Sequence, residues 1–219
     1  DWYLKGIGER PGLFVEIQSN QGQWRIEDRY PPDGMEEMSL DLGGALSNIA
    51  GGTTNILPNG NFGPVYESSP LVEDIWISGL PRLHIDVSTS TLGGQIYALL
   101  EDCSDTGDCI HIGHAIMDLR YHEGGSDEQT WIPILETINA KMEFFAMDVQ
   151  IEAGHTIRLS LASTGEDYLP ASTSSVVTVQ EGPGSNLILD IIDSDSKLLF
   201  DPPECTHEVC LEWLNQTSV

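Results

Sequence analysis

The amino-acid sequence predicts an all-β protein built as an antiparallel β-sandwich, and three observations support this. After Pro81, the apolar residues Leu83, Ile85 and Val87 alternate with polar residues, as in a strand with one buried and one solvated face. Similar short segments recur along the chain and are separated by turns that contain glycine or proline. No helical period is sustained over ten or more residues. This combination is typical of a sandwich.

The turn signals define the predicted elements. Gly79 and Pro81 divide one apolar run into two strands, and Asn20-Gln21-Gly22 is a hairpin turn signal. Residues 43–70 are the least regular stretch, and a loop of this length is either functional or packed over a surface. Short helices are expected only at 45–50 and 209–214. The predicted strands cover residues 13–17, 23–27, 38–42, 72–78, 82–88, 94–101, 110–121, 130–136, 142–151, 155–162, 175–180 and 187–192.

Composition limits the classes of partner. The chain has 219 residues, enough for one sizeable core, and 35 Asp and Glu against 9 Lys and Arg give a net charge of −26. Such a surface repels phosphate backbones and anionic lipid, so nucleic acid is not expected as a partner. The acidic residues are scattered, which favours a solvated surface over cation binding. No run of about 18 apolar residues is present, so we expect no membrane insertion.

Four cysteines fall into two close pairs, Cys103 with Cys109 and Cys205 with Cys210. The sequence leaves three connectivities open, and the short separations favour two local bridges. A zinc site is the alternative, but neither pair has the C-x2-C spacing of structural zinc motifs. Bridged cysteines indicate an oxidising compartment, so we expect an exported protein, extracellular or on the cell surface.

Five segments, in order along the chain, resemble one known domain family. Residues 24–32, which begin with Trp24 and Arg25, fit a W-R-x-x-x-x-(W/Y)-P-P opening segment, and residues 94–102 and 113–120 fit two further strands. The two main segments fit at Gly79, Pro81, Leu83, Ile85 and Val87, and at Gly154, His155, Ile157, Arg158, Leu159 and Leu161. On these residues the chain resembles the C-terminal non-catalytic domain of X-prolyl dipeptidyl aminopeptidases and cocaine-esterase-like (CocE/NonD) serine hydrolases.

The resemblance implies a jelly roll of the galactose-binding-like type over residues 11–192. Residues 1–10 are then interpreted as a linker or strap, and residues 193–219 as a C-terminal extension with a disulfide loop. The chain does not begin with a signal-peptide pattern. We expect Asp1 and Trp2 to lie at a cut within a longer protein. Residues 148–161 are expected to form a hairpin in which His155 holds the turn through hydrogen bonds and takes no part in chemistry.

The resemblance also implies a function. In this family the serine nucleophile and its Asp and His partners belong to an α/β-hydrolase domain, and this chain has no G-x-S-x-G elbow. We therefore expect an accessory domain, inactive alone, of a secreted X-prolyl dipeptidyl-peptidase or esterase-like serine hydrolase whose catalytic domain is encoded upstream. It would shape substrate access or support homo-oligomer formation, with residues 3–10 and 43–70 as contact segments. No catalytic residue and no cofactor are expected in this chain.

Two acidic clusters are candidates for calcium, which jelly rolls often hold with loop carboxylates. Neither matches the D-x-[DN]-x-[DN]-G loop, so calcium stays an alternative. His111 and His114 are three residues apart, which on a helix would suggest a metal-binding face; on a strand such residues point to opposite sides, and we expect no metal there. The calcium candidates are Asp102, Asp105 and Asp108 in one cluster, and Asp193 and Asp195 in the other.

Two functions of other classes stay open. The same fold serves carbohydrate-binding modules, and an exposed aromatic side chain could stack on a sugar. The candidates are Trp24, Trp76, Trp131 and Tyr97. Trp76 and Tyr97 could face outward, but a large aromatic side chain on a sandwich is more often covered by a loop or by a neighbouring domain. The second alternative is an extracellular surface or filament subunit, suggested by export, acidity and disulfides. The sequence does not identify the substrate of the parent enzyme.

Overall fold

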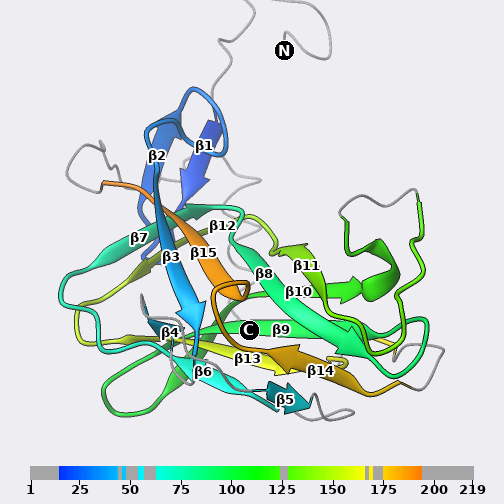
Figure 1. Cartoon of the computed structure of the whole chain (residues 1–219). Coiled ribbons are helices and arrows are strands. Elements are labelled where there is room, and N and C mark those ends of the chain that lie inside the picture. Colours follow the sequence, from blue (N-terminus) through cyan, green and yellow to red (C-terminus); the bar gives the residue numbers. More distant parts are fainter. Residues whose placement is uncertain are drawn as a thin grey trace, which may run out of the picture.

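The computed structural model describes residues 15–43, 46–47, 54–56, 63–123, 128–165, 168–169 and 175–193. Two antiparallel sheets pack face to face, and a separate two-stranded hairpin projects from them (Figure 1). No helix in this part of the chain is long and apolar enough to cross a membrane. The elements are β1 (Val15–Gln18), β2 (Trp24–Glu27), β3 (Glu36–Leu42), β4 (Leu46–Ser47), β5 (Thr54–Ile56), β6 (Val65–Glu67), β7 (Ile75–Gly79), β8 (Arg82–Thr89), β9 (Gln95–Cys103), β10 (Cys109–Asp118), the 3-10 helix η1 (Leu119–Tyr121), β11 (Ile138–Glu143), β12 (Met147–Ile151), β13 (Thr156–Ala162), β14 (Val177–Gln180) and β15 (Asn186–Ile191).

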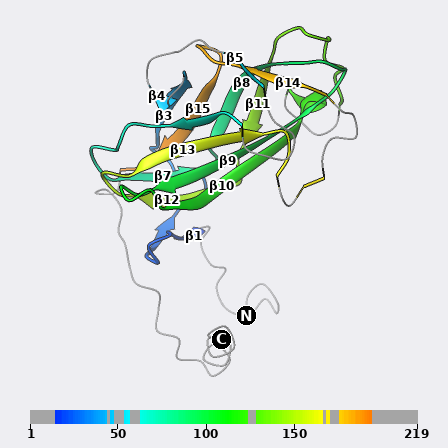
Figure 2. The same ribbon diagram turned by 90° about the horizontal axis from the view of Figure 1, so that it is seen from below.

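The larger sheet has nine strands in the order β12-β7-β15-β8-β14-β5, to which β11 adds on β8, β3 on β15 and β4 on β3. The smaller sheet has the order β10-β9-β13-β6. Figure 2 shows the two layers, with β9, β10 and β13 of the smaller sheet on one side and β8, β11 and β15 of the larger sheet on the other. Strands β1 and β2 pair only with each other.

The core lies between the two sheets and follows from strand alternation. Every second residue of β8 is buried, and the buried side chains of β8 belong to the same cluster as those of β9 and β13. Each such aliphatic side chain contributes roughly 1.5–3 kcal/mol when fully buried. The central members are Leu83, Ile85, Val87, Ile96, Ala98, Leu100, Ile157, Leu159 and Leu161.

The prediction of an all-β antiparallel sandwich is confirmed. The break between two strands at Gly79 and Pro81 is also confirmed, because β7 ends at Gly79 and β8 begins at Arg82. The jelly-roll subtype and the domain division at residues 11 and 192 stay predictions. The strap at 1–10, the helix at 209–214 and the Cys205–Cys210 loop lie outside the described residues.

Five local expectations are wrong. Residues 130–136 form a loop with a turn, in which Pro133 has no N–H to donate to a ladder and Leu135 has a φ of 63°. The strand expected at 142–151 is two strands, β11 and β12, because the chain crosses from β8 to β7 between them. The helix expected at 45–50 contains strand β4, and the loop expected at 43–70 contains β4, β5 and β6.

The fifth wrong expectation is the hairpin at 148–161. β12 pairs with β7 in the larger sheet, whereas β13 pairs with β9 and β6 in the smaller one. The turn at Glu152–His155 is therefore an arch that connects the two layers. Gly154 has a φ of 88°, a conformation that residues with a Cβ rarely adopt.

The end of β7 gives a testable prediction. Gly79 has a φ of 156°, and a Cβ built there lies 3.0 Å from Oδ2 of Asp190. We expect Gly79→Ala to lower the free energy of unfolding by about 1–3 kcal/mol, measured by urea titration. Gly22→Ala is the matched control, because Gly22 also has a positive φ but no atom within 4 Å of the added Cβ. A smaller loss at Gly79 than at Gly22 would contradict this explanation.

Candidate functional site

A buried charged cluster fixes the β1–β2 hairpin to the larger sheet. Arg25 of β2 is 1% exposed, and its Nη1 and Nη2 donate to the two carboxylate oxygens of Asp148 at 2.8 and 2.6 Å. Nη2 also donates to Ser78 Oγ at 2.7 Å, and Nε donates to Glu27 at 2.8 Å. The guanidinium lies over the ring of Trp76, with Cζ 4.7 Å from the centroid.

The register of β7 and β12 places the partners of Arg25 side by side. Asp148 pairs with Ser78 across the two strands, and its carboxylate accepts from Ser78 Oγ at 2.7 Å and from Trp76 Nε1 at 2.8 Å. Five hydrogen bonds among Arg25, Asp148, Ser78 and Trp76 thus converge on one place on the outer face of the sheet. Successive side chains of a strand point to opposite sides, and Arg25 is the residue of β2 that points toward the sheet. Its neighbours in β2 are less buried.

Both ends of the hairpin carry further hydrogen bonds to β12. At the turn, Asn20 Nδ2 donates to the Gln150 carbonyl at 2.9 Å, and the Gln150 N–H donates to Asn20 Oδ1 at 2.8 Å. After β2, the Tyr30 hydroxyl donates to the Met147 carbonyl at 2.6 Å. The W-R-x-x-x-x-Y-P-P motif therefore has a structural reason, since its Arg and its Tyr both attach the hairpin.

Burial and neighbouring charges shift the pKa values of Arg25 and Tyr30 in this cluster. Burial alone would lower the pKa of Arg25, but the hydrogen bonds and charges of Asp148 and Glu27 more than offset this and raise the pKa. The pKa of Tyr30 is raised by burial and by the negative charge of Asp148. Arg25 therefore stays charged in this cluster.

Two hollows, with volumes of about 590 and 750 Å³, lie beside Trp76, and the smaller one is also lined by Gln21 and Gln23 of the hairpin turn. Both are lined by Asp74, Ile75 and Trp76. The larger one also carries Glu36, Glu37, Glu73 and Asp193, so it presents mainly negative charge. Ile26 projects from the hairpin and is 56% exposed. Together, the hairpin and the two hollows offer a protein partner an apolar projection beside acidic depressions.

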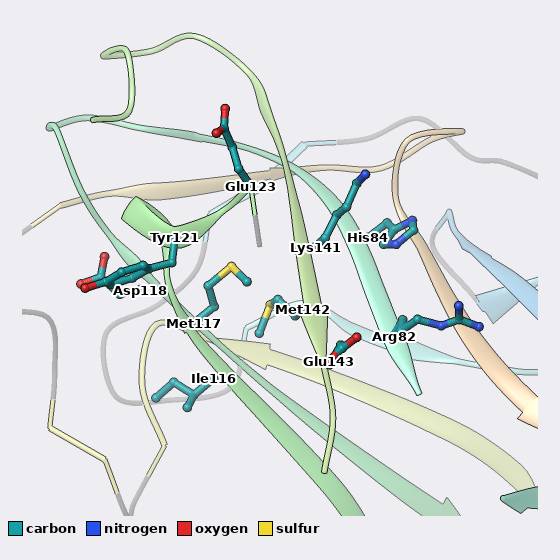
Figure 3. Close-up of a pocket in the computed structure, with 10 residues that line it drawn as sticks. All are labelled: Arg82, His84, Ile116, Met117, Asp118, Tyr121, Glu123, Lys141, Met142 and Glu143. Atoms are coloured by element: carbon teal, nitrogen blue, oxygen red, sulfur yellow. The ribbon is translucent and has the colours of Figure 1, made fainter. Parts of the chain in front are cut away.

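A third hollow, of about 670 Å³, lies at the edge between the sheets, where β8 and β11 face β10 (Figure 3). Arg82 is paired there with Asp190 at 2.9 Å and Glu37 at 3.0 Å. Lys141 is the cross-strand neighbour of His84. The pKa of His84 is lowered by burial and by the positive charges of Lys141 and Arg82. Its charged lining residues are Arg82, Lys141, Asp118, Glu123 and Glu143.

The other motif residues serve the framework. Trp24 is half-buried in the hairpin, Pro81 is buried between β7 and β8, and Leu83 and Leu159 are in the core. His155 Nδ1 is 2.7 Å from Asp102 Oδ1, which attaches the arch to β9. Arg158 of β13 is 3.5 Å from Glu67 of β6.

The Asp residues considered as calcium ligands lie in different surroundings. Asp102 is buried against His155, whereas Asp105 and Asp108 lie in the turn closed by a Cys103–Cys109 disulfide. Asp108 accepts from Thr106 Oγ1 at 3.1 Å. Asp193 is described and lines the larger hollow beside the hairpin, and Asp195 lies outside the described residues. Among the described residues, no three His, Cys, Asp or Glu side chains are grouped as metal ligands.

Trp76 and Tyr97 are covered, as expected for large aromatic side chains on a sandwich, so neither is an exposed platform. Trp76 is 2% exposed because Arg25 and the hairpin cover it, and Tyr97 is buried beside Tyr168 and His114. Trp131, in the loop before β11, is 65% exposed. Among the four candidate residues, Trp131 is therefore the one with an exposed ring.

The sequence-based reasoning missed the partners of Arg25. Asp148, Ser78 and Tyr30 all lie within the segments that carry the family resemblance, but they are far apart in the sequence. One signal for the ion pair was available. The chain has only 9 Lys and Arg, and both Arg25 and Asp148 occur in those segments.

These features define a class: an antiparallel β-sandwich with an attached hairpin and, among its described residues, no assembled catalytic group. The family model of the X-Pro dipeptidyl-peptidase C-terminal non-catalytic domain matches residues 6–198, and the chain belongs to this family. No curated protein matches the chain in sequence.

Solved structures share the fold. A CocE/NonD family hydrolase from Staphylococcus aureus superposes with a TM-score of 0.72 at 14% identity, over 88% of this chain and 44% of that one. An aminopeptidase from a marine sediment Thaumarchaeota archaeon has a TM-score of 0.70 at 14% identity, over 88% and 42%. An α-amino acid ester hydrolase has a TM-score of 0.51 at 14% identity, over 83% and 36%. The chain thus spans less than half the length of these structures.

Removal of Arg25 tests the buried cluster. We expect Arg25→Ala to lower the free energy of unfolding by about 3–5 kcal/mol, because Asp148 would stay buried without its cation. Urea titration measures the loss. Arg29→Ala is the control: Arg29 pairs with Asp33 on the surface of the same segment, and its loss should change stability by no more than about 0.5 kcal/mol. Equal effects would contradict a specific role for Arg25.

The hollow in Figure 3 gives a pH prediction. The pKa of His84 lies below its usual 6.5, so the unfolded chain binds a proton at higher pH than the folded one does. Stability from His84 is therefore complete above pH 6.5 and falls as the pH decreases through the folded-state pKa. Lys141→Gln should raise the pKa of His84 in an NMR titration, and Lys141→Arg should not. A pKa that stays the same in Lys141→Gln would exclude Lys141 as a cause and leave burial and the charge of Arg82.

Proposed function

We propose that this chain is the accessory, non-catalytic domain of an exported X-prolyl dipeptidyl-peptidase or esterase-like serine hydrolase. In this role it packs beside an α/β-hydrolase domain and shapes access to the substrate. The family match over residues 6–198 carries the proposal. The matched structures support it, because an aminopeptidase and a CocE/NonD hydrolase each hold a domain of this fold within less than half of their length.

The β1–β2 hairpin is the proposed contact with the catalytic domain. It precedes the sandwich in the chain, where an upstream domain would join, and the Arg25 cluster holds it in one orientation. Ile26 supplies exposed apolar surface at its outer side. The acidic hollows beside it favour a catalytic domain with basic residues on the facing surface. Residues 3–10 and 43–70 are proposed as additional contacts.

Export and oligomer formation belong to the same proposal. The Cys103–Cys109 disulfide supports an oxidising compartment, extracellular or at the cell surface. A second bridge between Cys205 and Cys210 is proposed for the extension 193–219, after the jelly roll at 11–192. Packing of the sandwich against a second copy remains part of the proposed role, as does a strap or linker at 1–10.

Activity measurements on two proteins test the proposal. The 219-residue chain alone should not hydrolyse an Ala-Pro or acyl-ester chromogenic reporter, whereas the longer protein that contains it with an upstream catalytic domain should. In that longer protein, Ile26→Asp should lower both the melting temperature and the value of kcat/KM, because a charge would enter the domain interface. Ile110→Asp is the matched control, since Ile110 is 67% exposed on β10 of the smaller sheet, whereas the hairpin is attached to the larger one.

Three outcomes would contradict the proposal. Turnover by the 219-residue chain alone would make it an enzyme. Equal effects of Ile26→Asp and Ile110→Asp would remove the hairpin from the interface. Saturable binding to a panel of glycans that is lost in Trp131→Ala would favour a carbohydrate-binding module, which the exposure of Trp131 permits.

A further inference from the structure

The outer face of the smaller sheet carries a histidine pair that the proposed function does not use. His111 and His114 both lie on β10, and His111 Nε2 is 3.3 Å from His114 Nδ1. In a regular strand these two residues would point to opposite faces. The register of β10 against β9, however, shifts between His111 and Gly113, which marks a β-bulge. The bulge brings both imidazoles to one face, so the sequence-based reason for excluding a metal at this pair is wrong.

We propose that His111 and His114 form a zinc-binding site. Two Zn–N bonds of about 2.0–2.1 Å at the tetrahedral angle place their nitrogen atoms about 3.4 Å apart. The observed separation of 3.3 Å between His111 Nε2 and His114 Nδ1 is close to this distance. The same bonds at a right angle, as in a square-planar Cu(II) site, would need a separation of roughly 2.9 Å. The spacing therefore favours a tetrahedral ion.

Neighbouring side chains already orient His114 for this role. Its Nε2 lies 2.8 Å from the Tyr168 hydroxyl, and when Nε2–H donates to that oxygen, Nδ1 is the acceptor of the hydrogen bond with His111 Nε2. Zinc would replace the proton shared between these two nitrogen atoms. Metal-bound imidazoles commonly donate their second N–H in this way. The ring of Tyr97 stacks on His114 with centroids 5.8 Å apart, and Phe145 contacts it edge-on at 5.1 Å. These contacts restrict the rotation of His114 and reduce the entropy lost on binding.

The surroundings favour a cation but supply few further ligands. Glu101 is the cross-strand partner of His111 on the same face, and the chain carries a net charge of −26. The part of the chain that the structure describes contains no group of three or more candidate ligands, so water would complete the coordination. A site with two protein ligands binds more weakly than a structural zinc site with four.

Calorimetric titration of the 219-residue chain with zinc chloride tests the proposal. We expect one saturable site, and at least a tenfold loss of affinity in His111→Gln, which keeps a polar side chain but removes the imidazole. Tyr168→Phe should weaken binding by about tenfold through the lost hydrogen bond. His84→Gln, on the other sheet, should bind zinc as the wild type does. NMR should place the largest zinc-induced changes at the His111 and His114 rings.

A background variant separates this site from the C-terminal Cys205, His207 and Cys210. With Cys205→Ser, His207→Ala and Cys210→Ser combined, the zinc site should persist. Loss of binding in this background, or unchanged binding in His111→Gln, would overturn the proposal. The absence of any saturable zinc binding would also overturn it, and the pair would then be a hydrogen-bonded contact only. None of these outcomes bears on the proposed accessory function, which rests on separate residues.

Discussion

The ion pair between Arg25 and Asp148 is the interaction on which the arrangement of the molecule outside its core depends. Removing two charges from water costs several kcal/mol for each ion, and only well-directed partners offset that cost. Here the guanidinium has Asp148, Ser78 and Glu27 as acceptors and the face of Trp76 beneath it. An isolated two-stranded hairpin is only marginally stable in water. The hydrogen bonds of this cluster therefore hold the hairpin in its position on the larger sheet.

This arrangement separates the stability of the domain from the orientation of its contact surface. The hydrophobic cluster between the sheets contains no residue of β1 or β2. The sandwich can thus be stable by its own core, while the hairpin is oriented by directional polar contacts. Because charge-assisted hydrogen bonds require defined geometry, they suit a surface that must face another domain in one way. A purely apolar attachment would bury similar area with less directional control.

The sequence predicts the sandwich well because period-two alternation, as at Leu83, Ile85 and Val87, records directly which face is buried. It does not record which strands pair. Residues 148–161 read as a hairpin, since the Glu-Ala-Gly turn is the same whether the next strand joins its own sheet or the opposite one. The bulge at Ile112 was equally hidden, because one extra residue in a strand leaves the local composition unchanged. The Arg25 cluster was missed for the same reason: its members meet only through long-range register.

A double-mutant cycle between Arg25 and Asp148 tests the central claim most directly. Arg25→Met, Asp148→Leu and the combined variant would be unfolded in urea, and the hairpin amides would be followed by hydrogen exchange. Our account predicts a coupling energy of about 2–3 kcal/mol, with both single variants losing protection in β1 and β2 while the core strands keep theirs. Additive losses within about 0.5 kcal/mol, or a hairpin that stays protected in both single variants, would contradict it.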